Sequence, residues 1–365
     1  MLEVKNTILG HLQRHGKQKV VVAMSGGVDS TVVAALLKDA GHEVIGITLQ
    51  LYNTEFEVKN TGTCCAGKDI YDAQIAAAKI DIPHYVFNYE NNFKVEVMDK
   101  FADSYMRGET PIPCILCNQK IKFRDLLRAA KDLSADRMAT GHYVQRVDND
   151  IPELHKGLDP IKDQSYFLFT TTQNQLTMLE FPLGGITKDI TREIAVYYGL
   201  SISNKPDSQD ICFVPNGNYR EIVRQLRPDA EKKGHIMMID GSIVGEHNGI
   251  INYTVGQRRG INISYSEPLY VIKIDAKNNI VIIGPRNALL ITTFMIKDIN
   301  WLIEPQNLEC TVKLRSAHSG SIASIEIVND TEATVILYDE YAGVTPGQAC
   351  VMYDGTRLLG GGWIC

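Results

Sequence analysis

Hydrophobic and polar positions follow two different patterns along the chain, and the change comes near residue 205. Before it, a short uninterrupted β-branched run predicts a buried strand at residues 20–24, and an apolar run predicts a second strand at 43–51. Residues 84–89 are strand-like, and residues 136–144 are expected to form a strand that runs into a turn. Stretches with apolar residues at helical spacing predict helices at residues 30–40, 68–81 and 92–108. Strands that alternate with helices are typical of an α/β domain with a mostly parallel sheet, which we predict for the first half.

The pattern after residue 205 consists of short β-branched runs separated by glycines and turn residues. Such spacing indicates two small β domains. We therefore expect an α/β domain over residues 1–205, a central β-rich domain over 206–285 and a C-terminal β-barrel over 286–365.

Composition narrows the functional classes only a little. The chain has 365 residues, of which 44% are hydrophobic, and no apolar run approaches the ~20 residues that span a bilayer. The N-terminal stretch has no apolar signal core. We expect a cytoplasmic protein without a membrane partner.

Charge gives a mixed indication about nucleic acids. The net charge of −6 argues weakly against a nucleic-acid partner. Residues 117–137, however, carry six Lys or Arg against three Asp. This stretch is either a local basic face for RNA or an ordinary solvated helix face.

The stretch "SGGVDS", residues 25–30, lies between a predicted strand and a predicted helix. Backbone N–H groups of such a glycine turn and of the following helix N-terminus converge on one point and attract an anion. The lysine that phosphate loops usually carry is missing. Asp29 is interpreted as a Mg²⁺ partner or as a brace for the loop. An ordinary capped strand–turn–helix is the alternative.

Two of the eight cysteines have a suggestive context. Cys117 is predicted to lie just before an amphipathic helix, with Asn118 as the cap, and basic neighbours should lower the pKa of its thiol. Such a thiol would be a nucleophile. Cys212 follows a polar loop, and its apolar neighbours also allow plain buried packing. In a chain of this length we expect thiols rather than a disulfide scaffold.

Several motifs, taken together, resemble those of one family. The "SGGVDS" stretch resembles the PP-loop of ATP pyrophosphatases. With "TPIPCILCN", "ATGHYV", "KDQSYFLF", "SQDICFVP", "INYTVGQRRGI" and "GVTPGQACVMY", the chain resembles the tRNA-specific 2-thiouridylases along nearly its whole length.

The resemblance implies a reaction. The family uses ATP, with Mg²⁺, to adenylate the C2 oxygen of the wobble uridine (position 34) of tRNA, and a cysteine persulfide then delivers sulfur while AMP leaves. By position, Cys212 would carry the persulfide. Cys117 would be the partner thiol that frees the sulfur or closes a disulfide with Cys212. Implied partners are tRNAs for Lys, Glu and Gln, and a sulfur donor such as a cysteine desulfurase or a relay protein.

The same matching implies two sets of binding residues. The ATP contacts would be Ala23, Met24, Ser25, Gly26, Gly27, Val28, Asp29, Ser30, Leu49 and Gly141. The tRNA contacts would be Ile112, Pro113, Cys114, His142, Lys162, Asp163, Gln164, Arg315, Ser316 and Gln348. Alternatives stay open: His142 as a strand-end residue bonded to backbone, Asp163 as a helix cap, and Arg258 and Arg259 as a solvated hairpin tip.

Cys114 departs from the family, many of whose members have an aspartate there. Cysteine is a weak substitute for an acid, so the proton-transfer role is in doubt. The change also creates a Cys114-x-x-Cys117 pair, and with Cys212 it allows an iron–sulfur cluster instead of a persulfide. Cys64 and Cys65 are interpreted as loop or core residues, and Cys310, Cys350 and Cys365 as without a chemical role.

Two further functional classes remain as alternatives. A PP-loop ligase or amidotransferase would adenylate its substrate without needing Cys117 and Cys212. An RNA- or metal-binding protein with a vestigial nucleotide fold would bind ATP without turnover. The intact loop at residues 25–30 argues against the second of these.

Overall fold

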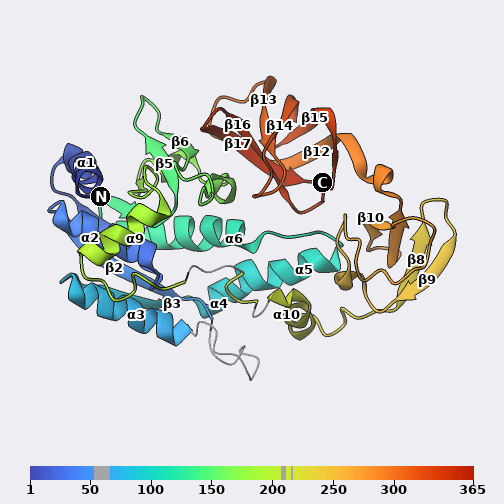
Figure 1. Ribbon diagram of the computed structural model, residues 1–365, viewed down its shortest axis with the longest axis horizontal. Coiled ribbons are helices and arrows are strands. Elements are labelled where there is room, and N and C mark those ends of the chain that lie inside the picture. The colour runs from blue at the N-terminus through green and yellow to red at the C-terminus, as the bar shows by residue number, and fades with distance from the viewer. Residues whose placement is uncertain (53–65, 207–210, 215–216) are drawn as a thin grey trace. The chain divides into compact units, whose positions relative to one another are not determined.

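The computed structural model describes residues 1–52, 66–206, 211–214 and 217–365, which divide into two compact units (Figure 1). The first unit comprises Met1–Glu96, Ile115–Pro215 and Thr356–Leu358. The second comprises Val97–Cys114, Asn216–Gly355 and Leu359–Cys365. Each unit is therefore built from separate stretches of chain. The three-part division expected from the sequence stays a prediction.

The first unit is built on a five-stranded parallel sheet with the order β3-β2-β1-β4-β7. Its strands are β1 (Lys19–Ala23), β2 (Glu43–Gln50), β3 (His84–Asn88), β4 (Arg137–Ala139) and β7 (Leu179–Glu180). The central residues Val20, Val21 and Val22 are at most 1% exposed, as expected for a parallel sheet covered on both faces. This confirms the predicted α/β class.

Helices around this sheet bury an apolar core. Helix α2 contacts α1, α3 and α9 as well as β1 and β2 (Figure 1). Its apolar residues, Val32, Val33 and Leu36 among them, are fully buried. The bounds are α1 (Leu2–Leu12), η1 (Gln13–His15), α2 (Val28–Asp39), α3 (Ala66–Lys79), η5 (Ser165–Leu168), α8 (Gln173–Leu176) and α9 (Lys188–Tyr197).

Two longer helical stretches change from α to π geometry along their length. One runs through α4 (Glu90–Phe93), η3 (Lys94–Asp99) and α5 (Lys100–Met106), and it is followed by Gly108 with φ +76°. The other runs through α6 (Pro113–Leu116), η4 (Cys117–Leu126) and α7 (Leu127–Asp132). The apolar face predicted for the second is buried at Phe123, Leu126, Leu127 and Ala130.

A hairpin in the first unit pairs with residues from near the end of the chain. Strands β5 (Val144–Val147) and β6 (Glu153–Lys156) are antiparallel. His155 is in register with Arg357, and the Lys156 N–H donates to the Thr356 carbonyl. This pairing explains why Thr356–Leu358 belongs to the first unit.

The second unit contains a four-stranded sheet with the order β10-β11-β8-β9. Ile236, Val271, Val281 and Ile283 are buried in its core. The elements are β8 (Gly234–Met238), β9 (Ile243–His247), η7 (Ile250–Asn252), β10 (Tyr270–Asp275), β11 (Ile280–Gly284) and the helix α10 (Tyr219–Leu226). Helix α10 contacts α5 of the same unit, and Tyr219 stacks on Tyr105 with ring centroids 4.4 Å apart.

The rest of the second unit is a closed barrel. The order β12-β15-β14-β13-β16-β17 closes because β12 also pairs with β17. Ile296, Val312, Ile325 and Val335 are at 0% exposure in its interior. The bounds are η8 (Arg286–Leu289), β12 (Leu290–Trp301), β13 (Leu308–Lys313), β14 (Ser321–Asn329), β15 (Glu332–Ala342), β16 (Ala349–Asp354) and β17 (Arg357–Ile364). The predicted C-terminal β-barrel is confirmed.

Within the described part of the chain, no helix is both long and apolar enough to cross a membrane.

Candidate active site

The turn at residues 24–27 joins β1 to α2 and fits closely against α3. Gly26 has φ +72°, and a Cβ atom there would lie 2.1 Å from the Asp69 carbonyl oxygen. Only glycine combines this positive φ with so close a backbone approach. The first backbone N–H groups of α2 have no acceptor within the helix. The turn and the helix start together therefore have the arrangement of backbone N–H groups that favours an anion. We call residues 25–30 the phosphate turn.

Side-chain hydroxyl groups stabilise this turn by hydrogen bonds to its backbone. The Ser25 N–H donates to Ser30 Oγ at 3.1 Å, and the Thr31 hydroxyl donates to the Gly27 carbonyl at 3.0 Å. Ser30 and Thr31 are buried, whereas Ser25 is exposed. The side chains therefore hold the turn in shape while one hydroxyl stays accessible to a ligand.

Asp29, in the first turn of α2, is held by a buried lysine. Lys188 Nζ lies 2.7 and 2.8 Å from the two carboxylate oxygens, and the Tyr143 hydroxyl donates to one of them at 2.9 Å. The side chain of Lys188 is only 9% exposed. Of the two interpretations of Asp29, the brace agrees with these contacts. The Mg²⁺ interpretation of Asp29 stays a prediction.

A second lysine holds the turn from the side of α3. Lys205 Nζ lies 2.9 Å from the Gly26 carbonyl oxygen, 2.8 Å from Asp69 Oδ1 and 2.5 Å from Asp72 Oδ2. Burial lowers the pKa of Lys205, but hydrogen bonds to Asp69 and Asp72 outweigh it and raise the pKa overall. Sequence reasoning missed both lysines. Lys205 stands seven residues before Cys212, without a local signal that it would reach the turn.

Other predicted ATP contacts gather at the same sheet edge. β1 has β2 and β4 as parallel neighbours, so the residues at their carboxyl ends lie beside the turn. A Cβ atom on Gly141, which follows β4, would lie 2.9 Å from both Asp29 Cβ and the Ser30 nitrogen. Leu49, near the end of β2, is half-buried. The predicted set around residues 23–30 is thus brought together with Gly141.

His142 lies in the apolar core rather than at the surface. It is 8% exposed, and its ring meets those of Phe123 and Phe181 at 5.9 and 6.4 Å. Burial holds the pKa of His142 well below its usual value, and nearby Lys122 adds to this. Its Nδ1 lies 2.7 Å from the Thr140 hydroxyl. A neutral core histidine agrees with these contacts, and its role in RNA binding stays a prediction.

The Lys162–Gln164 stretch has structural contacts of its own. Asp163 accepts hydrogen bonds from the Ser165 backbone N–H at 3.1 Å and from its hydroxyl at 2.9 Å, at the start of η5. Gln164 Oε1 accepts from the Tyr143 N–H at 3.0 Å. The N-cap position of η5 is Gln164, without a side-chain cap hydrogen bond, so Asp163 binds Ser165 but does not cap the helix as interpreted. The RNA contacts of this stretch stay predictions.

Cys117 does not precede its helix, as the sequence suggested. Pro113 begins the helical stretch, so Cys117 follows a complete turn of α6. Proline is favoured in the first turn because its missing N–H needs no partner there. Asn118 is accordingly no cap; its amide donates to the Phe167 carbonyl at 3.2 Å. The thiol is half-buried, and the argument from a helix N-terminus does not apply to it.

Cys212 is exposed, so the alternative of plain buried packing is wrong. The next residue, Phe213, is buried and meets Phe93 of α4 edge-on, with ring centroids 5.6 Å apart. Helix α4 also contacts η4, which begins at Cys117. Both cysteines therefore belong to segments that pack on the same short helix of the first unit.

The remaining predicted RNA contacts belong to the second unit. Gln348 donates to the Thr110 carbonyl at 2.8 Å and thereby holds the segment that leads to Ile112 and Pro113. Arg315 donates to the Gly343 carbonyl at 2.9 Å and is exposed, as is Ser316. Cys114 is exposed as well. Arg315, Ser316 and Cys114 are thus accessible, whereas Ile112 and Gln348 are half-buried and Pro113 is buried. Their contacts with RNA stay predictions.

The remaining cysteines differ in burial and in whether the structure describes them. Cys64 and Cys65 lie outside the described residues. Cys310 and Cys350 are buried in the barrel, where burial raises the pKa of Cys310 to about 12, whereas Cys365 is exposed. Among the described residues no three His, Cys, Asp or Glu side chains are grouped to hold a metal. The three-cysteine cluster is therefore not favoured.

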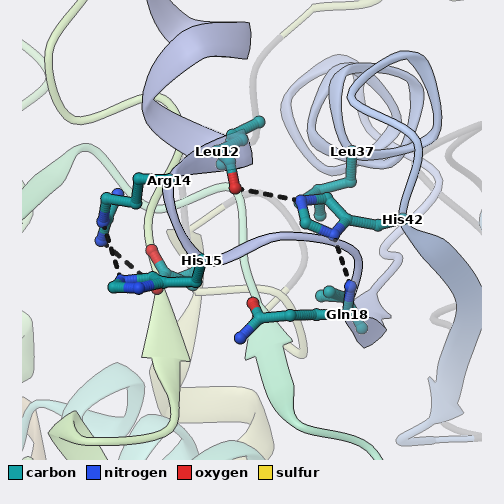
Figure 2. Close-up of a pocket in the computed structure, with 8 residues that line it drawn as sticks. Leu12, Arg14, His15, Gln18, Leu37 and His42 are labelled. Atoms are coloured by element: carbon teal, nitrogen blue, oxygen red, sulfur yellow. Dashed lines mark hydrogen bonds and ion pairs between the residues drawn. The ribbon is translucent and has the colours of Figure 1, made fainter.

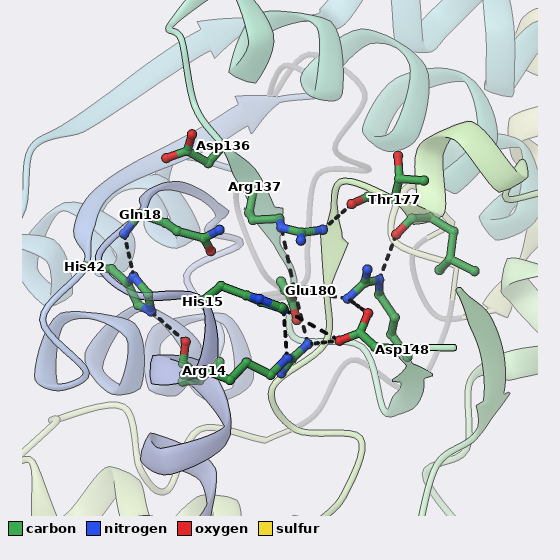
Figure 3. A network of polar contacts seen from close by, with 12 residues as sticks. Arg14, His15, Gln18, His42, Asp136, Arg137, Asp148, Thr177 and Glu180 are labelled. Atoms are coloured by element: carbon green, nitrogen blue, oxygen red, sulfur yellow. Dashed lines mark hydrogen bonds and ion pairs between the residues drawn. The ribbon is translucent and has the colours of Figure 1, made fainter. Parts of the chain in front are cut away.

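A second polar cluster, not foreseen from the sequence, lies around the edge strand β7. Glu180 Oε1 is 3.3 Å from Arg146, 3.7 Å from Arg14 and 3.9 Å from Arg137, and Asp148 binds both Arg14 and Arg146 (Figure 3). We call these five residues the arginine network. Its members contact one another and backbone carbonyls, which marks it as structural.

A small cavity borders the arginine network, with His42 in its wall (Figure 2). The Gln18 N–H donates to His42 Nδ1 at 3.0 Å, so Nε2 carries the proton and donates to the Leu12 carbonyl at 3.1 Å. His42 thus joins α1 to the start of β1. Neither feature adds a reactive group to the phosphate turn.

Three family models match consecutive parts of the chain. Residues 18–216 match the model of the tRNA methyl transferase HUP domain, residues 222–285 the tRNA methyl transferase PRC-barrel domain, and residues 291–364 the aminomethyltransferase beta-barrel domain. A solved NMN synthetase from Francisella tularensis is only distantly similar, with a TM-score of 0.37 and 16% identity over 62% of this chain and 85% of that one.

Curated relatives match over almost the whole chain. The tRNA-specific 2-thiouridylase MnmA of Rickettsia conorii is 55% identical over 350 residues, which cover 94% of this chain and 95% of that protein. MnmA of Rickettsia bellii is 56% identical over the same shares. With a phosphate turn at residues 25–30 and an exposed Cys212 in place, the chain belongs to the tRNA-specific 2-thiouridylases.

Proposed function

We propose that this enzyme thiolates C2 of the wobble uridine of tRNA with Cys212 as the persulfide carrier and Cys117 as the second thiol. The family supplies the reaction, an ATP-dependent sulfur transfer to tRNA. The observation that carries the residue roles is the placement of the two cysteines. Cys212 is exposed, and the segments of both cysteines pack on α4.

The first step is activation of the uridine. The turn at residues 24–27 and the start of α2 hold the leaving pyrophosphate through backbone N–H groups. The uridine C2 oxygen attacks the α-phosphorus, the bond to the β-phosphate oxygen breaks, and pyrophosphate leaves. Because the chemistry is at the α-phosphate, a lysine aimed at the β and γ phosphates is not needed. Lys188 and Lys205 instead hold the turn in shape.

The second step moves sulfur. The terminal sulfur of the Cys212 persulfide attacks C2, and AMP leaves with the former C2 oxygen. Cys117 thiolate then attacks the Cys212 sulfur, which forms a Cys117–Cys212 disulfide and leaves both electrons of the broken S–S bond on the new thiocarbonyl. A dithiol reductant restores the two thiols before a sulfur donor reloads Cys212. A cysteine desulfurase or a relay protein fits the donor role.

The tRNA acceptors expected are those for Lys, Glu and Gln, and the enzyme is expected to act in the cytoplasm with them. Arg315, Ser316 and Cys114 of the second unit are exposed and available for such contacts. Mg²⁺ is expected as the partner of ATP itself, since Asp29 is already engaged by Lys188.

The test compares single cysteine variants in a thiolation assay with purified tRNA, ATP and a persulfide donor. Cys212→Ser should make no 2-thiouridine yet still release pyrophosphate in the presence of tRNA. Cys117→Ser should load one additional sulfur atom on Cys212, detectable by intact mass, and fail to complete transfer. Cys365→Ser, which changes an exposed cysteine in the barrel, is the matched control and should retain full activity. Full thiolation by Cys212→Ser would remove the persulfide role.

A further inference from the structure

Lys205 is held by three oxygen atoms that come from two different elements. Its ammonium group contacts the Gly26 carbonyl and the carboxylates of Asp69 and Asp72, at 2.9, 2.8 and 2.5 Å. The two aspartates are three residues apart and therefore lie on one face of α3. The lysine side chain is 17% exposed. An ammonium group has three N–H donors, and this site supplies one acceptor for each.

The contact with Gly26 determines how the next amide points. In a trans peptide the carbonyl of one residue and the N–H of the next point in opposite directions. Because Lys205 binds the Gly26 carbonyl, the Gly27 N–H points away from Lys205, and the helix α2 begins directly after it. An N–H group held in this way costs no reorganisation when an anion binds.

The backbone around Lys205 is held as well. Arg192 of α9 donates to the Ser203 carbonyl at 2.6 Å and to the Lys205 carbonyl at 3.2 Å. Seven residues further along the chain is Cys212, and Phe213 packs on Phe93. A separation of seven residues along the sequence spans at most about 24 Å, which limits how far Cys212 can lie from Lys205.

We propose that Lys205 is a positioning residue that orients the Gly27 amide for the pyrophosphate of ATP and fixes the chain that carries Cys212. One side chain thus serves both half-reactions, nucleotide binding through Gly26 and sulfur transfer through the backbone leading to Cys212. The second part rests on the proposed function of Cys212, whereas the first part does not.

The test uses Lys205→Met, Lys205→Arg and the control Lys68→Met in the full-length enzyme. Lys68 is an exposed residue of the same helix as Asp69. Lys205→Met should raise KM for ATP about tenfold or more, since small displacements of preoriented groups have effects of this size. At saturating ATP its thiolation rate should also stay low, while pyrophosphate release recovers. Lys205→Arg should recover part of the ATP affinity, and Lys68→Met should match the wild type.

Two further measurements keep the result interpretable. If Lys205→Met alone lowers the melting temperature strongly, the double variant Lys205→Met/Asp72→Asn removes one uncompensated carboxylate and should fold, yet keep the raised KM. A wild-type KM for ATP in either folded variant would overturn the proposal. Calorimetry measures ATP binding independently of Cys212. Full activity of Cys212→Ser would therefore overturn the persulfide role of Cys212, while the effect of Lys205→Met on ATP binding would persist.

Discussion

Two clusters of oppositely charged side chains lie in the first unit. They differ in whether backbone N–H groups without an acceptor lie beside them. At the phosphate turn, Lys188 binds Asp29, and Lys205 binds Asp69 and Asp72. In the arginine network around β7, three arginines surround Glu180 and Asp148 (Figure 3). The first cluster consists of lysines that each hold part of one turn, and the second of arginines that each contact several acceptors.

The difference follows from side-chain chemistry and exposure. A planar guanidinium binds several oxygens at once, so the arginine network satisfies itself, and Arg146 is only 5% exposed. A lysine is a compact charge. Asp29 beside Lys188 is 31% exposed, about as much as Asp148 of the arginine network at 34%, but Asp29 stands in the first turn of α2, beside backbone N–H groups that have no acceptor within the helix. We conclude that a charge cluster marks a functional site when it lies beside backbone N–H groups that have no acceptor. A cluster whose charged groups bind only one another and backbone carbonyls is structural.

The largest effect is expected for Lys188→Met. It leaves the Asp29 carboxylate uncompensated beside the site where the phosphates bind. We expect kcat/KM for ATP to fall about 100-fold, and the free energy of unfolding to fall by about 3 kcal/mol, as for a broken, largely buried ion pair. Steady-state kinetics and urea unfolding measure both. The double variant Lys188→Met/Asp29→Asn should regain most of the stability, and failure to do so would contradict the brace role.

Gly141→Ala should have the next largest effect on ATP binding. The new Cβ would lie 2.9 Å from both Asp29 Cβ and the Ser30 nitrogen, atoms that cannot give way without moving the start of α2. We expect the affinity for ATP to fall about tenfold, by displacement of preoriented N–H groups. Calorimetric titration with ATP measures it. Gly185→Ala, where a Cβ meets nothing within 4 Å, is the control; equal affinities in both variants would contradict the prediction.

Glu180→Gln tests the other side of the comparison. Removal of this buried charge leaves Arg14, Arg137 and Arg146 with less compensation. We expect the free energy of unfolding to fall by about 2 kcal/mol, with KM for ATP unchanged. The control is Glu43→Gln, which removes the exposed carboxylate that pairs with Lys19. This change should have little effect on the free energy of unfolding. A raised KM for ATP in Glu180→Gln would break the distinction between the two clusters.

The smallest effect concerns acid stability. Burial raises the pKa of Asp148, but Arg146 and Arg14 outweigh it, so the pKa lies below its usual value of 3.8. The folded state then binds fewer protons than the unfolded state between the two pKa values. The stabilisation is present above pH 3.8 and is lost as the pH falls through the lower value. In Asp148→Asn, the free energy of unfolding should fall less steeply below pH 4 than in the wild type. The difference should be less than about 1 kcal/mol, because the side chain is partly exposed. An unchanged acid transition in urea titrations would contradict this.

The elements of the fold could be predicted because local patterns determine them. Apolar runs such as residues 20–24 and 43–51 became β1 and β2, and the glycine-separated region after residue 205 became the second unit's sheet and barrel. The phosphate turn was also predictable, since its residues are contiguous. Cys117 was misplaced by one turn because the helix starts at Pro113, and a proline is compatible with either a loop or a first turn.

The partners of the turn could not be predicted, because they come from distant parts of the chain. Lys188 lies 159 positions from Asp29, and Lys205 lies 179 positions from Gly26. Nothing in their local context distinguishes them from solvated lysines. The arginine network is equally non-local, with Arg14 and Asp148 separated by 134 positions. Only the three-dimensional arrangement shows which charges meet.

The pairing of His155 with Arg357 has a consequence for biosynthesis. Domains generally form as units while the ribosome still elongates the chain, N-terminal parts first. Here the first unit receives Thr356–Leu358 only after the 355 residues before them have been made. A nascent chain that stops before Thr356 therefore lacks a piece of its first unit, although that unit also contains Met1–Glu96.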